Sequence, residues 1–322
     1  MLCRKLILRS DGMEVGRTPM LVPSISSRLN IGLEKLLETV SDSVDGPLMI
    51  SAYDFDVVKD LEIDFPSLIF LDSGGYECAI THDIPDACLY SQNQRDDWNQ
   101  DKHKSVLDNW KSNIPTVAIS YDHPSLRTTI SNQIGIAADL FSKHNRYLKE
   151  IIIKPETVGA IRIPVEKIVS SITAFRGFDV IGFTEKELGH SVLERMVNIS
   201  KIRKALDRED LRIPIHIFGS LDPIITPLYF FSGADIFDGL SWLRFTFEAG
   251  DAKYTDSCGP KLFDASTDCR AVWGQSVAHN VTYIRKLELD LGKFVTKQDF
   301  DAFGTNADFF KKTFDDFEEK TR

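Results

Sequence analysis

The sequence predicts an α/β fold, namely a (β/α)8 TIM barrel with an N-terminal β-hairpin and a C-terminal helical tail. Two apolar runs lead directly into an aspartate followed by glycine or a small residue, SLIFLDSGG at 67–75 and GADIFDG at 233–239. Short apolar runs alternate with helix-like stretches, and no Gly/Ser/Pro tract divides the chain. We therefore expect a single barrel domain over residues 1–322, longer than the roughly 250 residues of a usual barrel.

The beginning of the chain predicts a hairpin. Residues 5–9 and 18–23 have the apolar character of strands and flank the turn Ser-Asp-Gly at 10–12. An Asp-Gly pair between two strands is a strong signal for a tight turn.

The central part of the chain predicts the barrel itself. Strand candidates follow one another at 47–52, 67–71, 116–120, 150–153 or 160–163, 179–182, 213–218 and 234–237. Leucine, isoleucine and valine recur every three or four residues at 31–40, 165–175 and 192–206, which predicts helices. The number of strand–helix units approaches eight, for which a closed barrel is the simplest architecture.

The end of the chain predicts an amphipathic helix. From Phe300 onward, aromatic residues are spaced among charges at Phe303, Phe309, Phe310, Phe314 and Phe317. We expect this helix to dock on the barrel rather than to bind a partner or a membrane.

Composition limits the possible partners and compartments. The chain has 38 basic and 48 acidic residues, a net charge of −10, which argues against broad binding to nucleic acid. Basic residues between Lys201 and Arg212 are interrupted by acids and indicate a solvated helix face. The sequence shows neither a signal peptide nor an apolar run of about 18 residues, so we expect a cytoplasmic protein without membrane contact. Its five cysteines form no CxxC pair, and no disulfides are expected.

Three aspartates are expected to meet at one end of the barrel. Asp72, Asp122 and Asp238 each follow an apolar run, and the carboxyl ends of barrel strands converge on one mouth. Crowding and burial make one such carboxyl group an acid, while another stays ionised as a nucleophile or base. A pair about 5 Å apart can break a C1′–N bond through a covalent glycosyl intermediate. The glycines after Asp72 allow close approach of a flat ligand, and Tyr76 offers a ring for stacking.

These segments resemble those of a known family. Residues 72–76, DSGGY, resemble the DSGG(F/Y)Q motif of the tRNA-guanine transglycosylases, and residues 233–238 are similar to their G(V/I)D(M/I)FD segment. Further stretches match in the same order, 17–23 to TPxFMPV, 120–122 to the FDE strand end, 177–182 to GFDxxAIGG, 217–219 to LMGVG and 279–280 to the late HN pair. Each motif is short, but their shared order over roughly residues 5–290 argues against coincidence.

The resemblance implies a role for each matching residue. Asp238 would be the nucleophile at C1′ and Asp72 the general acid/base. The base would be bound by Asp122, Tyr76, Phe218, Gly182 and Gly219, and Arg244, at the place of the arginine in the family's LPTR loop, would contact the polynucleotide. From the residues alone, the two aspartates can equally cap helices or pair with arginines, the two aromatic rings can be core residues, and Arg244 can be a solvated surface residue.

Departures from the family pattern are also informative. The CxCxxC zinc cluster is missing, and Cys258, Cys269 and His279 leave a tetrahedral site one ligand short, so no metal is expected. Glu77 stands where the motif has glutamine, and Phe183 replaces the second glycine of AIGG. These features look more like the zinc-free branch associated with 7-deazaguanine insertion into DNA.

The leading hypothesis is therefore an enzyme that exchanges guanine in a polynucleotide, DNA rather than tRNA, for a 7-deazaguanine such as preQ0, without a cofactor. One alternative is a tRNA-guanine transglycosylase acting on tRNA. Another is a noncatalytic paralogue that binds a deazapurine or nucleic acid. An unrelated barrel aldolase or hydrolase has little support, because the sequence has no GxSxG or HExxH motif and no strand-end lysine that can be assigned to a Schiff base.

Overall fold

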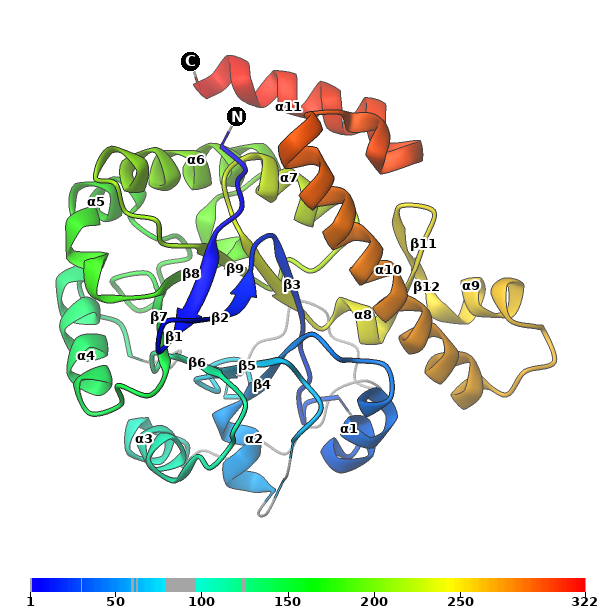
Figure 1. The fold of residues 1–322 in the computed structure, drawn as a ribbon, viewed down its shortest axis with the longest axis horizontal. Coiled ribbons are helices and arrows are strands. Elements are labelled where there is room, and N and C mark those ends of the chain that lie inside the picture. Colours follow the sequence, from blue (N-terminus) through cyan, green and yellow to red (C-terminus); the bar gives the residue numbers. More distant parts are fainter. Residues whose placement is uncertain are drawn as a thin grey trace.

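The computed structural model describes residues 2–29, 31–58, 61, 63–78, 97–122 and 126–321 (Figure 1). Its centre is an eight-stranded parallel sheet in the order β3-β10-β9-β8-β7-β6-β5-β4. A parallel bridge between Ser24 and Met49 brings the two outer strands together, so the sheet is nearly closed into a barrel. The strands are β3 (Met20–Pro23), β4 (Pro47–Ser51), β5 (Leu68–Asp72), β6 (Thr116–Ile119), β7 (Leu148–Ile153), β8 (Val180–Thr184), β9 (Ile215–Phe218) and β10 (Ile236–Gly239). The predicted fold class is confirmed.

The N-terminal hairpin is present, but its second strand differs from the prediction. Strands β1 (Ile7–Ser10) and β2 (Met13–Arg17) pair around Asp11 and Gly12, which have φ values of 49° and 79°. Such positive angles are typical of an Asp-Gly hairpin turn. The segment 18–23 instead contains the first barrel strand, β3. Leu8 of the hairpin joins the buried cluster inside the barrel, where the hairpin covers the amino-terminal end.

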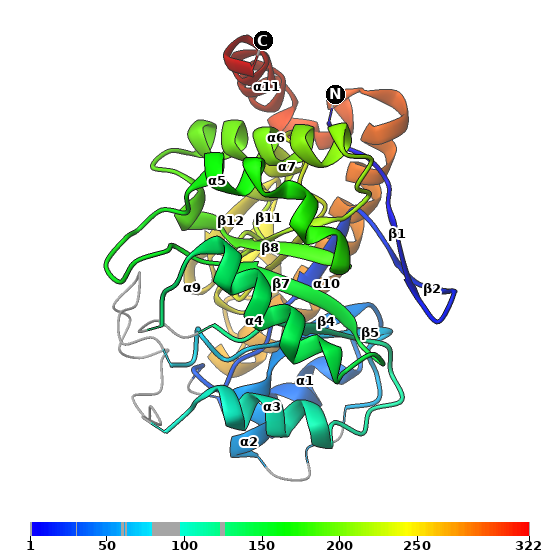
Figure 2. The ribbon, with the colours of Figure 1, turned by 90° about the vertical axis from the view of Figure 1, so that its left-hand side faces the viewer.

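Helices surround the sheet (Figures 1 and 2). They are α1 (Leu33–Ser41), α2 (Ala52–Val57), α3 (Gln100–Asn109), α4 (Ile130–Ser142), α5 (Val165–Ser170), η1 (Ile172–Gly177), η2 (Glu185–Leu188), α6 (Val192–Arg208), α7 (Ile225–Phe231) and α8 (Ser241–Arg244). The helices predicted at 31–40 and 192–206 are confirmed within two residues. The one predicted over 165–175 is divided at Ser171, and residues 160–163 are not a strand.

The chain after β10 adds a hairpin and a helical tail. Strands β11 (Phe245–Glu248) and β12 (Asp251–Tyr254) precede α9 (Thr255–Leu262), α10 (Cys269–Lys297), η3 (Phe300–Asn306) and α11 (Ala307–Thr321). Helix α11 packs against α6 and α7, as Figure 1 also shows. The docked amphipathic helix is thus confirmed over α11, whereas the segment before it is the short η3, which is interrupted at Gly304 with a φ of 58°. No helix in the described residues is both long enough and apolar enough to cross a bilayer.

Alternation along each strand separates two cores. One set of side chains faces the helices, and the other fills the barrel interior with residues such as Val22, Met49, Phe70, Ile119 and Ile236. Four positions of the inward-facing set carry ionisable side chains, Asp72 on β5, Glu150 on β7, His216 on β9 and Asp238 on β10. The interior therefore becomes polar toward the carboxyl ends of the strands.

One of the basic residues between Lys201 and Arg212, which were predicted to lie on a solvated helix face, is in fact buried. Arg203 of α6 is fully buried and forms an ion pair with Asp235, just before β10. It also donates hydrogen bonds to the carbonyl oxygens of Gly233 (2.9 Å) and Ile213 (3.0 Å). Arg203 therefore fixes α6 to the segment that positions Asp238.

Candidate active site at the carboxyl ends of the strands

Asp238 lies near the carboxyl end of β10 and faces donors on both oxygens. The Ser24 hydroxyl donates to Oδ2 at 2.8 Å, and the Gly219 N–H donates to Oδ1 at 3.0 Å. Nε2 of His216 lies 3.3 Å from Oδ1. Gly219 adopts a φ of 77°, which favours glycine and directs its N–H at the carboxylate. The side chain is 8% exposed, so Asp238 is held firmly at the floor of the barrel mouth.

His216 and Glu150 form a buried pair beneath Asp238 that the sequence analysis missed. Nδ1 of His216 lies 2.7 Å from Oε1 of Glu150, and both side chains are fully buried. Burial alone would lower the pKa of His216, but Glu150 and Asp238 together raise it to about 9. Burial raises the pKa of Glu150, and His216 opposes that effect. The detectable signal in the sequence was a polar residue between isoleucines, as in IHIF at 215–218.

Asp72 ends β5 and lies in a different environment. Burial raises its pKa well above the ordinary value, and the nearby carboxyl groups of Glu77 and Asp122 add to the effect. Its Oδ2 accepts a hydrogen bond from the Gly74 N–H at 3.2 Å. Asp72 is half-buried and follows Phe70 by two residues, so both face the interior. The Phe70 ring lies 5.6 Å from that of His216, which links β5 to the group beneath Asp238.

Asp122 is held beside the segment that follows Asp72. The Ser73 hydroxyl donates to its Oδ1 at 2.5 Å. A Cβ on Gly75 would lie 2.3 Å from the same oxygen, so the glycine allows this close approach. Lys154, directly after β7, places Nζ 3.5 Å from Oδ2 of Asp122 and 3.0 Å from Oε1 of Glu187. The amine of this strand-end lysine is thus an ion-pair partner, whereas Schiff-base chemistry needs a free amine.

A second pair of acids lies next to Asp72. Asp54 and Glu77 are both buried, and the Ser26 hydroxyl donates to Oε1 of Glu77 at 2.6 Å. Burial raises the pKa of Glu77 to about 7, with a further contribution from Asp54. Burial likewise raises the pKa of Asp54 to about 7. These acids surround Asp72 with groups that keep protons near neutral pH.

The predicted base-binding residues lie around this mouth in different ways. The Phe218 ring stacks on His216, with centroids 4.1 Å apart, and is partly exposed. A Cβ on Gly182 would lie 2.4 Å from Cε2 of Phe218 and 2.7 Å from Oε1 of Glu150. Tyr76 is 42% exposed, and the Arg28 guanidinium lies 4.8 Å from its ring centroid. Gly182 therefore admits the Phe218 ring, and one face of Tyr76 already contacts a cation.

The remaining predicted residues belong to the segment after β10. Arg244 ends α8, where its guanidinium lies 5.5 Å from the Phe245 ring centroid. Asn280 is buried, accepts a hydrogen bond from the Phe247 N–H at 2.7 Å and donates to the Trp242 carbonyl at 2.7 Å. His279 Nε2 lies 2.9 Å from the Phe247 carbonyl oxygen. The HN pair thus attaches β11 to α10.

Cys258 and Cys269 are the cysteines that the sequence analysis considered, with His279, as metal ligands. Cys258 is buried and Cys269 is exposed, while Cys88 lies outside the described residues. Within the part of the chain that the structure describes, no three His, Cys, Asp or Glu side chains are placed to hold a metal ion.

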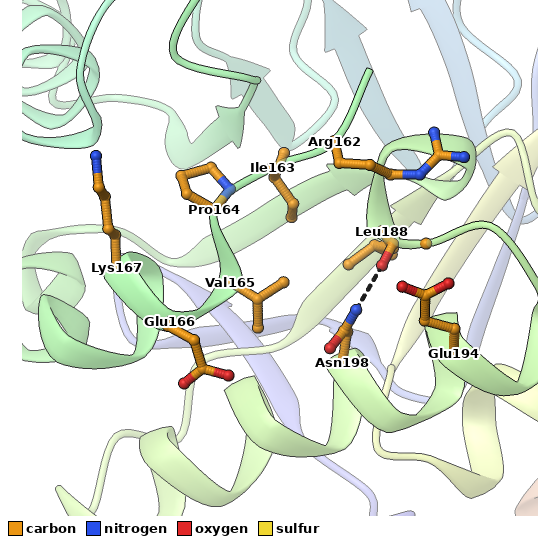
Figure 3. Close-up of a pocket in the computed structure, with 10 residues that line it drawn as sticks. Arg162, Ile163, Pro164, Val165, Glu166, Lys167, Leu188, Glu194 and Asn198 are labelled. Carbon is orange, nitrogen blue, oxygen red and sulfur yellow. Dashed lines mark hydrogen bonds between the residues drawn. The ribbon is translucent and has the colours of Figure 1, made fainter. Parts of the chain in front are cut away.

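A surface pocket of about 270 Å³ lies apart from these residues (Figure 3). It is formed by the segment before α5, by α5 itself and by residues around η2 and α6, where Asn198 donates a hydrogen bond to the Leu188 carbonyl oxygen at 2.8 Å. None of the strand-end carboxylates lines it. This pocket is therefore separate from the candidate site at the barrel mouth.

Comparisons with known proteins leave the family open. Neither a protein-family model nor a curated protein matches the chain.

Proposed function

We propose that this chain is a base-exchange transglycosylase that replaces guanine in a polynucleotide with a 7-deazaguanine, using Asp238 as nucleophile and Asp72 as general acid/base. The observation that carries the proposal is the contrast between two carboxyl groups at the same end of one barrel. Asp238 has a hydrogen-bond donor on each oxygen and lies 3.3 Å from the buried His216, whereas burial and neighbouring carboxyl groups raise the pKa of Asp72 well above its ordinary value. Such a division suits a carboxylate nucleophile and a carboxylic acid.

The first displacement breaks the bond between the sugar and guanine. An oxygen of Asp238 attacks C1′, the C1′–N bond breaks, and Asp72 gives its proton to the departing base. Oδ1 already faces the Gly219 N–H and His216, whereas Oδ2 has the rotatable Ser24 hydroxyl as its donor. We therefore assign the attack to Oδ2. In the second displacement the incoming base returns a proton to Asp72, and its nitrogen replaces Asp238 at C1′.

Base recognition is assigned to the neighbouring carboxylate and rings. Asp122 offers acceptor oxygens for the amide and amino groups of a guanine-like edge, and its position is set by Ser73 and Lys154. The partly exposed Phe218 supplies a flat apolar surface above His216. The preference for DNA and for preQ0 rests on the sequence resemblance to the zinc-free branch.

An exchange assay tests the proposal. The protein and labelled guanine or preQ0 are incubated in separate reactions with duplex DNA, single-stranded DNA or tRNA. The nucleic acid is then digested, and the masses of its nucleosides are measured. We expect label in DNA nucleosides with wild-type protein and none with Asp238→Asn or Asp72→Asn, although Asp72→Asn still binds nucleic acid. Label in tRNA alone would reverse the preference for DNA. Binding of guanine or preQ0 without exchange on any polynucleotide would favour the noncatalytic alternative.

A further inference from the structure

A line of three ionisable side chains crosses the barrel interior from β7 to β10. Glu150 Oε1 lies 2.7 Å from Nδ1 of His216, and Nε2 of the same ring lies 3.3 Å from Oδ1 of Asp238. Glu150 and His216 are fully buried. A histidine that only stabilised the core would need one such partner, whereas His216 faces a carboxylate on each side.

The surroundings of His216 make it a cation. Phe70 of β5, Phe218 of β9 and Gly182 of β8 bring no charge to it, so Glu150 and Asp238 are the charged groups that act on it. Burial opposes the charge, but these two carboxylates outweigh it and raise the pKa of His216 to about 9. The imidazolium therefore lies beneath the nucleophile at neutral pH.

We propose that Glu150 and His216 are positioning residues that keep one positive charge beside Oδ1 of Asp238 and so make Asp238 a good leaving group in the second displacement. The inference rests on the proposed base exchange. When Asp238 attacks C1′, its carboxylate becomes a neutral ester, and Glu150 remains as the counter-ion of His216. When the incoming base attacks, the C1′–O bond breaks and its electron pair returns to Asp238. The adjacent imidazolium stabilises this returning charge.

Replacing the histidine separates this role from simple damage. His216→Gln is incubated with labelled duplex DNA and guanine, quenched in denaturant and scored for both exchange and the protein–DNA adduct. We expect exchange to fall about 100-fold, while the adduct fraction rises severalfold, because ester hydrolysis and base return both need Asp238 to leave. A merely structural loss would lower both signals.

The double variant Glu150→Gln/His216→Gln addresses folding, because it removes the Glu150 charge that His216→Gln alone would leave buried without a partner, while Asp238 keeps its hydrogen bonds from Ser24 and Gly219. It should show the same rise in adduct. Ser24→Ala removes the donor to the other oxygen and should slow exchange without moving the alkaline limb of the pH profile. Wild-type exchange should fall above about pH 9 as the imidazolium loses its proton, and Glu150→Gln should move that limb to lower pH. The inference would be overturned if the alkaline limb were unchanged in Glu150→Gln and the adduct fraction were unchanged in the His216 variants.

A titration of the free protein keeps the inference testable whatever the substrate is. NMR of 15N-labelled histidine should show His216 as a cation at pH 7, with its pKa lowered in both Glu150→Gln and Asp238→Asn. A neutral His216 at pH 7 would refute the inference even if base exchange occurs. A cationic His216 in a protein without exchange activity would support the charge arrangement and instead refute the proposed function.

Discussion

At the scale of single residues, glycines decide how closely the functional groups approach one another. Gly182 is the clearest case, since a Cβ at this position would contact both the Phe218 ring and the Glu150 carboxylate at less than van der Waals distance. Neither neighbour is a free surface side chain, because Phe218 stacks on His216 and Glu150 is fully buried. The position therefore controls the stacking surface and the buried ion pair together.

We predict that Gly182→Ala weakens base binding by about tenfold, because overpacking of this kind costs about 1–3 kcal/mol and displaces Phe218. Calorimetric titration with guanine or preQ0 measures the change. Gly135→Ala is the matched control, since a Cβ there meets nothing within 4 Å. Equal affinities in the two variants would remove Phe218 from the base-binding surface.

Single residues were placed correctly from the sequence where an apolar run marks the end of a strand. Asp72 and Asp238 follow apolar runs directly, and both lie at the carboxyl ends of barrel strands. His216 and Glu150 were missed because a lone polar residue inside an apolar strand is usually a satisfied core residue, and their pairing depends on β7 and β9 being two strands apart across β8. Only the assembled sheet brings these side chains together.

At the scale of elements, the C-terminal helix depends on one aromatic cluster. Phe231 of α7 lies 5.8 Å from Phe310 and 6.1 Å from Phe314 of α11, measured between ring centroids. It also lies 4.6 Å from Phe294 of α10. The cluster joins three helices that are separated in the sequence, so α11 is part of the folded barrel's outer layer.

We predict that Phe314→Ala lowers the free energy of unfolding by about 3–5 kcal/mol, because the ring is buried and its removal leaves a cavity. Phe309→Ala on the same helix should change it by no more than about 0.5 kcal/mol. The exposed fractions are 6% for Phe314 and 47% for Phe309. Urea denaturation compares the two, and similar losses would show that α11 is not docked through this face.

Element boundaries were predicted less well than element types. The Asp-Gly turn was predicted correctly, but the second strand of its hairpin is β2. Residues 18–23 instead contain β3, which pairs with β10 in the barrel. The division of α5 from η1 at Ser171 and the hairpin β11–β12 gave no clear periodic signal. For residues 18–23 the outcome was decided by pairing with a distant strand, which local patterns do not contain.

At the scale of the whole molecule, the nearly closed parallel sheet gives the candidate site its geometry. Five strands, or the segments directly after them, each contribute a residue to the site. These strands are β3, β5, β7, β9 and β10. The carboxyl ends of these parallel strands all lie at one end of the barrel. Carboxylates that are far apart in the sequence therefore lie at that same end. The alternation of apolar and helical segments was sufficient to predict this architecture. The reaction itself stays a proposal that rests on site chemistry and motif resemblance.

In the proposed reaction, Asp238 carries the sugar during exchange. The most direct measurement is to trap the reaction with 9-deazaguanine on guanine-containing DNA and to locate the protein–DNA linkage by peptide mass spectrometry. We expect a linkage on the peptide that contains Asp238, and no linkage in Asp238→Asn. An undiminished adduct in Asp238→Asn, or no adduct from folded wild-type protein with either DNA or tRNA, would contradict it.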